Sequence, residues 1–258
     1  MSLVHSAALA LAEEVPVALV FNGITHTVMM ASPLHLEDFA LGFSFTEGLI
    51  DKPSQLFGVE VVHQPNGIEL HLDVAAQVEV QLKERRRSMA GRTGCGLCGA
   101  DSLNQVKLRL PQVTPVAVDV NAMFRAHAHM RALQPLKQQT GATHAAAWSN
   151  LDGHITLLRE DVGRHNALDK LIGALLKTET AMQQGFICIT SRASFEMVQK
   201  TVMAGAGILT AASAPTRLAV DLADQHNLAL AGLIRGDSFQ SYSYPSRFTN
   251  IHTFASQV

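Results

Sequence analysis

The chain has 258 residues and a formal net charge of -2. This length is enough to bury a sizeable core in one domain or two lobes. A near-neutral charge gives no electrostatic reason to expect binding to nucleic acid or to a membrane surface. The uncharged stretch at residues 201–216 is interrupted by glycines and a proline. It is shorter than the ~20 residues that a membrane-spanning helix requires, so we expect no transmembrane segment.

The first part of the chain reads as two hairpins around one helix. Residues 17–30 turn at Asn22-Gly23, and residues 59–74 turn at Pro65-Asn66-Gly67, which are favoured hairpin sequences. Residues 37–50, between the hairpins, predict a helix. We therefore expect a smaller, hairpin-rich N-terminal lobe over residues 1–115.

After Pro111 and Pro115 the pattern changes to helices alternating with strands. The predicted helices lie at residues 121–133, 167–176, 194–206 and 217–226, and the predicted strands lie at residues 144–148, 154–158, 186–190, 208–212 and 228–234. Asn166 is interpreted as the N-cap of the second helix, with Asp169 as its acidic third residue. This order predicts a three-layer α/β lobe over residues 116–258.

Two of the three cysteines share one glycine-rich turn, Gly94-Cys95-Gly96-Leu97-Cys98-Gly99. Thiols three residues apart can reach each other or a shared sulfur atom, and the nearby Arg92 favours the thiolate form. Half of a structural zinc site is the alternative, but no second ligand pair follows at a suitable spacing. We therefore favour redox or sulfur-transfer chemistry and expect no metal.

The third cysteine, Cys188, lies in an apolar run. Three cysteines placed in this way do not make a disulfide framework, which indicates a reducing cytoplasm. The N-terminal stretch lacks a basic region and runs into Glu13 and Glu14, so we expect no signal peptide.

Two loops between a strand and a helix carry groups suited to anions. In residues 159–166, Arg164 could clamp a phosphate bidentately, and Asp161 could hold the ligand or accept a proton. In residues 190–194, Arg192 is flanked by hydroxyl residues. A solvated loop with ordinary capping remains open for the first loop, and simple N-capping by a serine remains open for the second.

Together these stretches resemble the formate dehydrogenase accessory sulfurtransferase (FdhD) family. The resemblance rests on the cysteine loop, on residues 160–170 (EDVGRHNALDK) and on residues 191–198 (SRASFEMV). It also includes residues 37–48 and 232–236, so it spans essentially the whole chain.

The resemblance implies a sulfurtransferase. Such a protein takes persulfide sulfur from a cysteine desulfurase and delivers it to the bis-molybdopterin guanine dinucleotide molybdenum cofactor, which formate dehydrogenase requires. Cys95 would carry the persulfide, and Cys98 would assist transfer or protect it. The residues expected to contact the cofactor, or a mimic such as GDP, are Asp161, Arg164, His165, Arg192, Leu233, Ile234, Arg235, Gly236, Asp237 and Ser238. The resemblance also implies a cytidine-deaminase-like C-terminal lobe and a homodimer.

Two other protein classes fit the sequence less well. A zinc deaminase needs H-x-E and P-C-x-x-C. His35-Leu36-Glu37 supplies the first motif, but Gly94 replaces the proline of the second. The context of a thioredoxin-like C-x-x-C is absent. A non-catalytic chaperone that binds the cofactor remains the alternative, and only a need for Cys95 separates it from the transferase.

Overall fold

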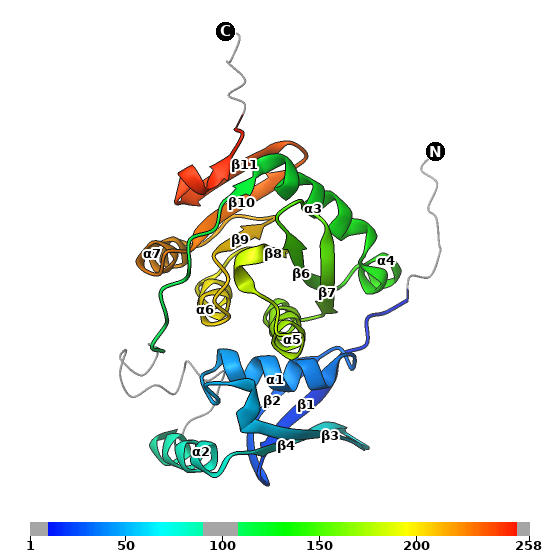
Figure 1. Cartoon of the computed structure of the whole chain (residues 1–258). Helices are drawn as coiled ribbons and strands as arrows, with labels where there is room; N and C mark the ends of the chain where they lie inside the picture. Colours follow the sequence, from blue (N-terminus) through cyan, green and yellow to red (C-terminus); the bar gives the residue numbers. More distant parts are fainter. Residues whose placement is uncertain (1–9, 90–107, 252–258) are drawn as a thin grey trace, which may run out of the picture.

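The structure is a computed structural model that describes residues 10–89 and 108–251. It contains two lobes, each built on its own sheet (Figure 1). The N-terminal lobe comprises β1 (Val15–Phe21), β2 (Ile24–Ala31), α1 (Leu36–Thr46), a 3-10 turn (Pro53–Gln55), β3 (Leu56–Gln64), β4 (Gly67–Val74) and α2 (Ala76–Met89). Its four strands lie in the order β2-β1-β4-β3, with β1 and β4 parallel.

Both predicted N-terminal hairpins are confirmed. The first turns at Asn22 and Gly23, whose φ angles of 45° and 79° are those that a tight hairpin needs. Alternate residues of β1, namely Val17, Leu19 and Phe21, are fully buried. They pack with α1 in the N-terminal core, which explains the alternating pattern in the sequence.

The C-terminal lobe holds the remaining elements. They are β5 (Val118–Asp119), α3 (Val120–Ala132), α4 (Pro135–Thr140), β6 (His144–Asn150), β7 (Ile155–Asp161), α5 (Arg164–Lys177), β8 (Gly185–Ile189), α6 (Phe195–Met203), β9 (Ile208–Ala211), α7 (Arg217–Gln225), β10 (Ala229–Arg235), β11 (Ser238–Ser243) and β12 (Phe248–Thr249), with 3-10 turns at Met182–Gln184 and Pro245–Arg247. Six strands form one sheet in the order β11-β10-β9-β8-β6-β7, and β5 pairs with β12. Leu110 and Val113 already pack in the core of this lobe.

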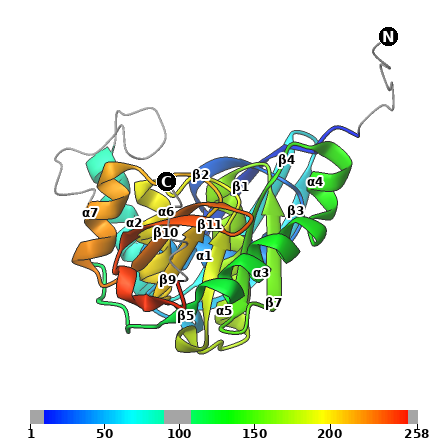
Figure 2. The ribbon, with the colours of Figure 1, turned by 90° about the horizontal axis from the view of Figure 1, so that it is seen from above.

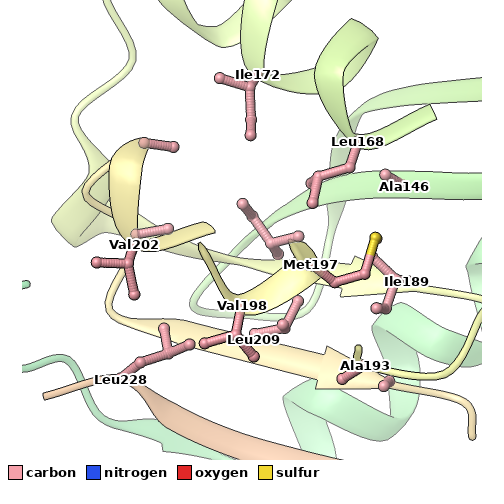
Figure 3. Close-up of a cluster of buried hydrophobic side chains, with 14 of the residues drawn as sticks. Ala146, Leu168, Ile172, Ile189, Ala193, Met197, Val198, Val202, Leu209 and Leu228 are labelled. Atoms are coloured by element: carbon pink, nitrogen blue, oxygen red, sulfur yellow. The ribbon is translucent and has the colours of Figure 1, made fainter. Parts of the chain in front are cut away.

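Each face of the six-stranded sheet has its own core. Alternation along β6 sends Ala146 and Trp148 to the core beneath α5, α6 and α7, and sends Ala145 and Ala147 to the core beneath α3. Figure 2 shows α3 running obliquely across the strands. Figure 3 shows the opposite core, where side chains of α5 and α6 meet those of the strands. The α/β class is therefore confirmed, with a helix layer on each face of the sheet. The likeness to cytidine deaminases stays a prediction.

The two lobes meet along α1 and α5, which lie against each other (Figure 1). The backbones touch at two glycines. A Cβ on Gly42 would lie 1.8 Å from the carbonyl oxygen of Asp169, and a Cβ on Gly173 would lie 1.9 Å from that of Asp38. Only glycine permits this approach, so the pair fixes how closely the lobes pack.

The capping interpretation of Asn166 is wrong. Helix α5 begins at Arg164 after the N-cap Gly163. Asn166 is buried inside the helix, where its Nδ2 donates to the carbonyl oxygen of Met30 at 2.8 Å and to Asp161 Oδ1 at 3.1 Å. Contacts with the other lobe, which the local pattern does not reveal, use this side chain. In the described ranges, no helix combines the length and apolar character needed to cross a bilayer.

Candidate functional site

Strands β7, β8, β9 and β10 run parallel, because β6 is antiparallel to both of its neighbours. Their carboxyl ends therefore meet at one edge of the sheet, the usual place for ligands in such lobes. Backbone bonds tie the loops of this edge together. Thr216 N donates to the Ala193 oxygen at 3.0 Å, and Leu233 N donates to the Ser213 oxygen at 3.3 Å. The stretches at residues 161–166, 190–194 and 233–238 thus lie along the same edge.

Arg164 and His165 open helix α5. Within the described part of the chain, Arg164 Nε and His165 Nε2 are buried without a hydrogen-bond partner. A cation at a helix N-terminus opposes the helix dipole, and the free N–H groups of the first turn add to the positive potential. An anionic group placed here would relieve both effects.

The second loop leads into α6. Ser194 is the N-cap residue of α6, but its side chain makes no capping bond. Its hydroxyl instead donates to Glu196 Oε2 at 2.8 Å, and that oxygen lies 3.8 Å from His165 Nε2. Arg192 is exposed on this loop, whereas Ser191 is buried and donates to the Arg192 carbonyl. The two loops that were predicted separately therefore meet through His165 and Glu196.

His165 and Glu196 differ in their charge at neutral pH. Burial, reinforced by the adjacent Arg164, lowers the pKa of His165 to about 4, while Glu196 and Glu47 act against the shift. Burial acts to raise the pKa of Glu196, but hydrogen bonds from its own backbone N–H and from Ser194 outweigh it, so that pKa is lowered. At neutral pH the imidazole is neutral and the carboxylate is charged.

A buried lysine lies behind the site. Lys200 Nζ lies 2.7 Å from Glu47 Oε1 and 3.0 Å from both Asp169 Oδ2 and Thr46 Oγ1. Burial raises the pKa of Asp169 to about 6. Burial also acts to lower the pKa of Lys200, but the Asp169 and Glu47 carboxylates outweigh it and raise that pKa. This network joins the end of α1 to α5 and α6.

The segment from Leu233 to Ser238 ends β10 and turns into β11. Gly236, with φ of 60°, begins the two-residue turn between Arg235 and Ser238. Leu233 has a φ of 56°, which marks an irregular strand end. The side chains of Leu233, Arg235, Asp237 and Ser238 are exposed at this turn. Ile234 is buried in the core beneath α3, so it can offer a ligand only its backbone.

The structure does not support a ligand contact for Asp161. Its side chain is fully buried, and Oδ2 lies 2.6 Å from Lys170 Nζ and 3.0 Å from Ser32 N. Its Oδ1 accepts from Gly163 N at 2.8 Å. The carboxylate is thus used at the junction of the lobes, where it positions the turn that presents Arg164. Burial of a charged residue beside a glycine loop is not visible in the local sequence.

Cys95 and Cys98 lie in residues 90–107, outside the described residues. The described chain resumes at Leu108, whose Cδ2 would lie 3.3 Å from a Cβ placed on Gly48, next to Glu47. Cys188 is buried in the core beneath α3, and burial raises the pKa of its thiol to about 12. It is therefore inert as a nucleophile.

The sequence analysis did not predict Glu47 and Lys200 near the site. It also did not predict that Glu196 lies beside His165. The available signal was weak, because a lysine in an otherwise apolar helical face is the only local sign of a buried ion pair.

Comparisons with known proteins agree with this architecture. The sequence model of the FdhD/NarQ family matches residues 12–249. The sulfur carrier protein FdhD of Cupriavidus necator is 52% identical over 240 residues, covering 92% of this chain and 82% of that protein. The protein of the same name from Bordetella petrii is 51% identical over 237 residues, covering 92% of this chain and 85% of that protein.

A solved structure shares the fold. It is the crystal structure of a putative formate dehydrogenase accessory protein from Desulfotalea psychrophila, with a TM-score of 0.73 and 22% identity. The match covers 92% of this chain and 90% of that chain. At this identity the likeness concerns the fold alone.

Proposed function

Since the chain belongs to the FdhD/NarQ family, we propose that it is a sulfur carrier that acts in the maturation of formate dehydrogenase. The observation that carries this proposal is that Arg164, His165 and Arg192 lie along the same sheet edge as residues 233–238, in a chain that also holds a C-x-x-C pair. The relatives named sulfur carrier proteins support the same role.

The sulfur chemistry belongs to Cys95 and Cys98. The Cys95 thiolate attacks the terminal sulfur of a persulfide on a cysteine desulfurase. The sulfur–sulfur bond of the donor breaks, the donor thiolate leaves, and Cys95 gains the persulfide with no net oxidation. Cys98 can then attack the Cys95 sulfur, which forms a disulfide and releases the outer sulfur as sulfide. A thiol reductant restores the pair for the next cycle.

The acceptor is the bis-molybdopterin guanine dinucleotide molybdenum cofactor, bound as a substrate. Its pyrophosphates require cationic and N–H donors, which Arg164, His165, Arg192 and Arg235 supply along the edge. Two of these side chains hold buried nitrogen atoms that have no partner within the described residues, which fits an absent anionic ligand. GDP should therefore bind as a fragment of the substrate.

Reconstitution of formate dehydrogenase tests the transfer. Inactive formate dehydrogenase is incubated with a cysteine desulfurase, cysteine and this protein, and its activity is measured with wild type and with Cys95→Ala. Loss of activation with retained GDP binding is expected. Full activation by Cys95→Ala would instead support the non-catalytic chaperone.

We further propose a cytoplasmic homodimer, as the family resemblance implies. Light scattering of the purified protein at micromolar concentration should give twice the chain mass of 27.8 kDa. A chain mass that stays single up to high concentration would overturn this part of the proposal.

A further inference from the structure

Glu196 places a carboxylate among the groups that should bind the anion. It stands in the first turn of α6, its Oε2 accepts from Ser194 Oγ at 2.8 Å, and the same oxygen lies 3.8 Å from His165 Nε2. Arg164 also acts electrostatically on this carboxylate. The hydroxyl, the imidazole and the guanidinium that would receive a phosphate therefore already face an internal negative charge.

Two features indicate that this charge is a counter-ion and not part of the internal framework. The Glu196 side chain keeps 36% of its surface exposed, unlike the nearby Asp169, which keeps 2%. Its distance to His165 is also too long for a hydrogen bond. When the carboxylate leaves, the buried Ser194 hydroxyl loses its acceptor, and an oxygen of the incoming phosphate would take that place.

An incoming phosphate would meet Glu196 as a like charge, and like charges brought together at an interface weaken binding. We propose that Glu196 is an internal counter-anion that lowers the affinity of this edge for a phosphate-bearing ligand and moves away from Ser194 and His165 when that ligand binds. The inference rests on the proposed function, because a carrier must release the cofactor that it binds.

The same geometry should link anion binding to the protonation of His165. The charged groups that act on His165 are Arg164 on α5, Glu196 and Lys200 on α6, and Glu47 after α1. Replacing Glu196 by glutamine removes a negative charge and should lower the pKa of His165 further. A bound dianion adds negative charge and should raise it.

The test is calorimetric titration of the full-length protein with GDP at pH 7.5. Glu196→Gln should bind GDP roughly fivefold to tenfold more tightly than wild type, and Glu196→Ala should shift affinity in the same direction. Glu69→Gln is the matched control. Glu69 also lies beside a histidine, with Oε2 2.8 Å from His71 Nε2, but on β4 of the N-terminal lobe, so its replacement should leave the GDP affinity unchanged.

Equal or weaker GDP binding by Glu196→Gln, with wild type binding normally, would overturn this inference and leave the proposed function intact. Failure of wild type itself to bind GDP at millimolar concentration would overturn the nucleotide site, and the inference with it. NMR titration of the His165 imidazole provides an independent measurement. Saturation with sulfate, which does not titrate near neutral pH, should raise the His165 pKa, and an unchanged pKa would count against the proposal.

Discussion

Lys170 and Lys200 are lysines buried at the junction of the lobes. Lys170 Nζ lies 2.6 Å from Asp161 Oδ2 and 2.8 Å from the carbonyl oxygen of Ser32, and the side chains of Lys170 and Asp161 are fully buried. Burial lowers the pKa of Lys170, and the Asp161 carboxylate offsets part of this effect. A buried pair of this kind adds little net stability but becomes costly when one partner is lost.

Lys170→Met should therefore lower the free energy of unfolding by ~3–5 kcal/mol, because Asp161 would stay buried without its counter-charge. Urea denaturation measures this difference. The double variant Asp161→Asn/Lys170→Met should recover part of the loss. A single variant within ~1 kcal/mol of wild type would contradict the assignment.

Burial of His127 should make the stability of the fold sensitive to acid. Its Nε2 lies 2.9 Å from Thr210 Oγ1, and burial, with help from Arg131, lowers its pKa from 6.5 to about 4. Between these values the unfolded chain binds a proton that the folded chain does not, so stability falls as pH drops from 6.5 toward 4. Asp169, with a pKa raised from 3.8 to about 6, contributes in the opposite direction.

Urea denaturation of wild type and His127→Gln at pH 7.5 and pH 5.0 isolates the contribution of His127 to the pH dependence of stability. Every other titratable group is present in both proteins. Glutamine keeps a nitrogen that can reach Thr210 but does not titrate. The variant should lose less stability than wild type between the two pH values. An identical loss in both proteins would show that folding does not lower the pKa of His127.

Arg192 is the most accessible test of the anion site, because its side chain is exposed and supports little of the fold. Arg192→Ala should weaken GDP binding about tenfold or more, the usual effect of losing a charged hydrogen bond. Calorimetric titration measures it. Arg125→Ala is the control and should bind as wild type does, because Arg125 is exposed on α3 and bonds the Asp152 carbonyl in the β6–β7 turn, at the opposite edge of the sheet. Equal affinities for both variants would exclude Arg192 from the site.

For single residues, the sequence predicts the chemical role of a side chain better than it predicts whether that side chain is buried. Arg164, His165 and Arg192 could be proposed because charged residues between a strand and a helix favour anions. The same rule failed for Asp161, because its partner Ser32 comes from the other lobe and its partner Lys170 reaches it from inside α5. Contacts across the lobes leave no local signature.

Among the elements, α1 and α5 bear the contact between the lobes. Asp38 on α1 accepts from Arg159 Nε at 2.8 Å and from Lys177 Nζ at 2.7 Å. These ion pairs tie the start of α1 to β7 and to the end of α5, while Gly42 and Gly173 fix the separation of the two helices.

Gly42→Ala should destabilise the protein by ~3 kcal/mol or more, at the upper end of the cost of overpacking, because the new methyl group would meet backbone and not a flexible side chain. Thermal or urea unfolding measures it. Gly58→Ala is the matched control, since a Cβ there meets nothing within 4 Å. A stability equal to that of wild type for Gly42→Ala would mean that the helices do not pack this closely.

Elements with strong periodicity were predicted and elements without it were not. The hairpins β1–β2 and β3–β4 and the helices α3 and α5 follow patterns that match their burial. Helix α2 is polar along much of its length, α4 has six residues, and β11 carries three serines in six positions. Contacts with other elements stabilise them: β11 pairs with β10, the first turn of α4 donates to Glu160, and two side chains of α2 pack in the N-terminal core.

The whole molecule joins a small sheet and a large one mainly through the packing of α1 against α5 (Figure 1). The described chain leaves the smaller lobe at Met89 and resumes at Leu108, beside Gly48. Glu47, next to that glycine, bonds Lys200 at 2.7 Å, and Lys200 belongs to the helix that presents Glu196. The lobe boundary and the cation-lined edge are therefore neighbours.

The central claim is that Cys95 carries sulfur. The most direct measurement is the intact mass of the protein after incubation with a cysteine desulfurase and cysteine, for wild type, Cys95→Ala, Cys98→Ala and the buried-thiol control Cys188→Ala. We predict that wild type, Cys98→Ala and Cys188→Ala gain one sulfur atom that a reductant removes, and that Cys95→Ala gains none. A gain in Cys95→Ala, or none in wild type, would contradict the claim.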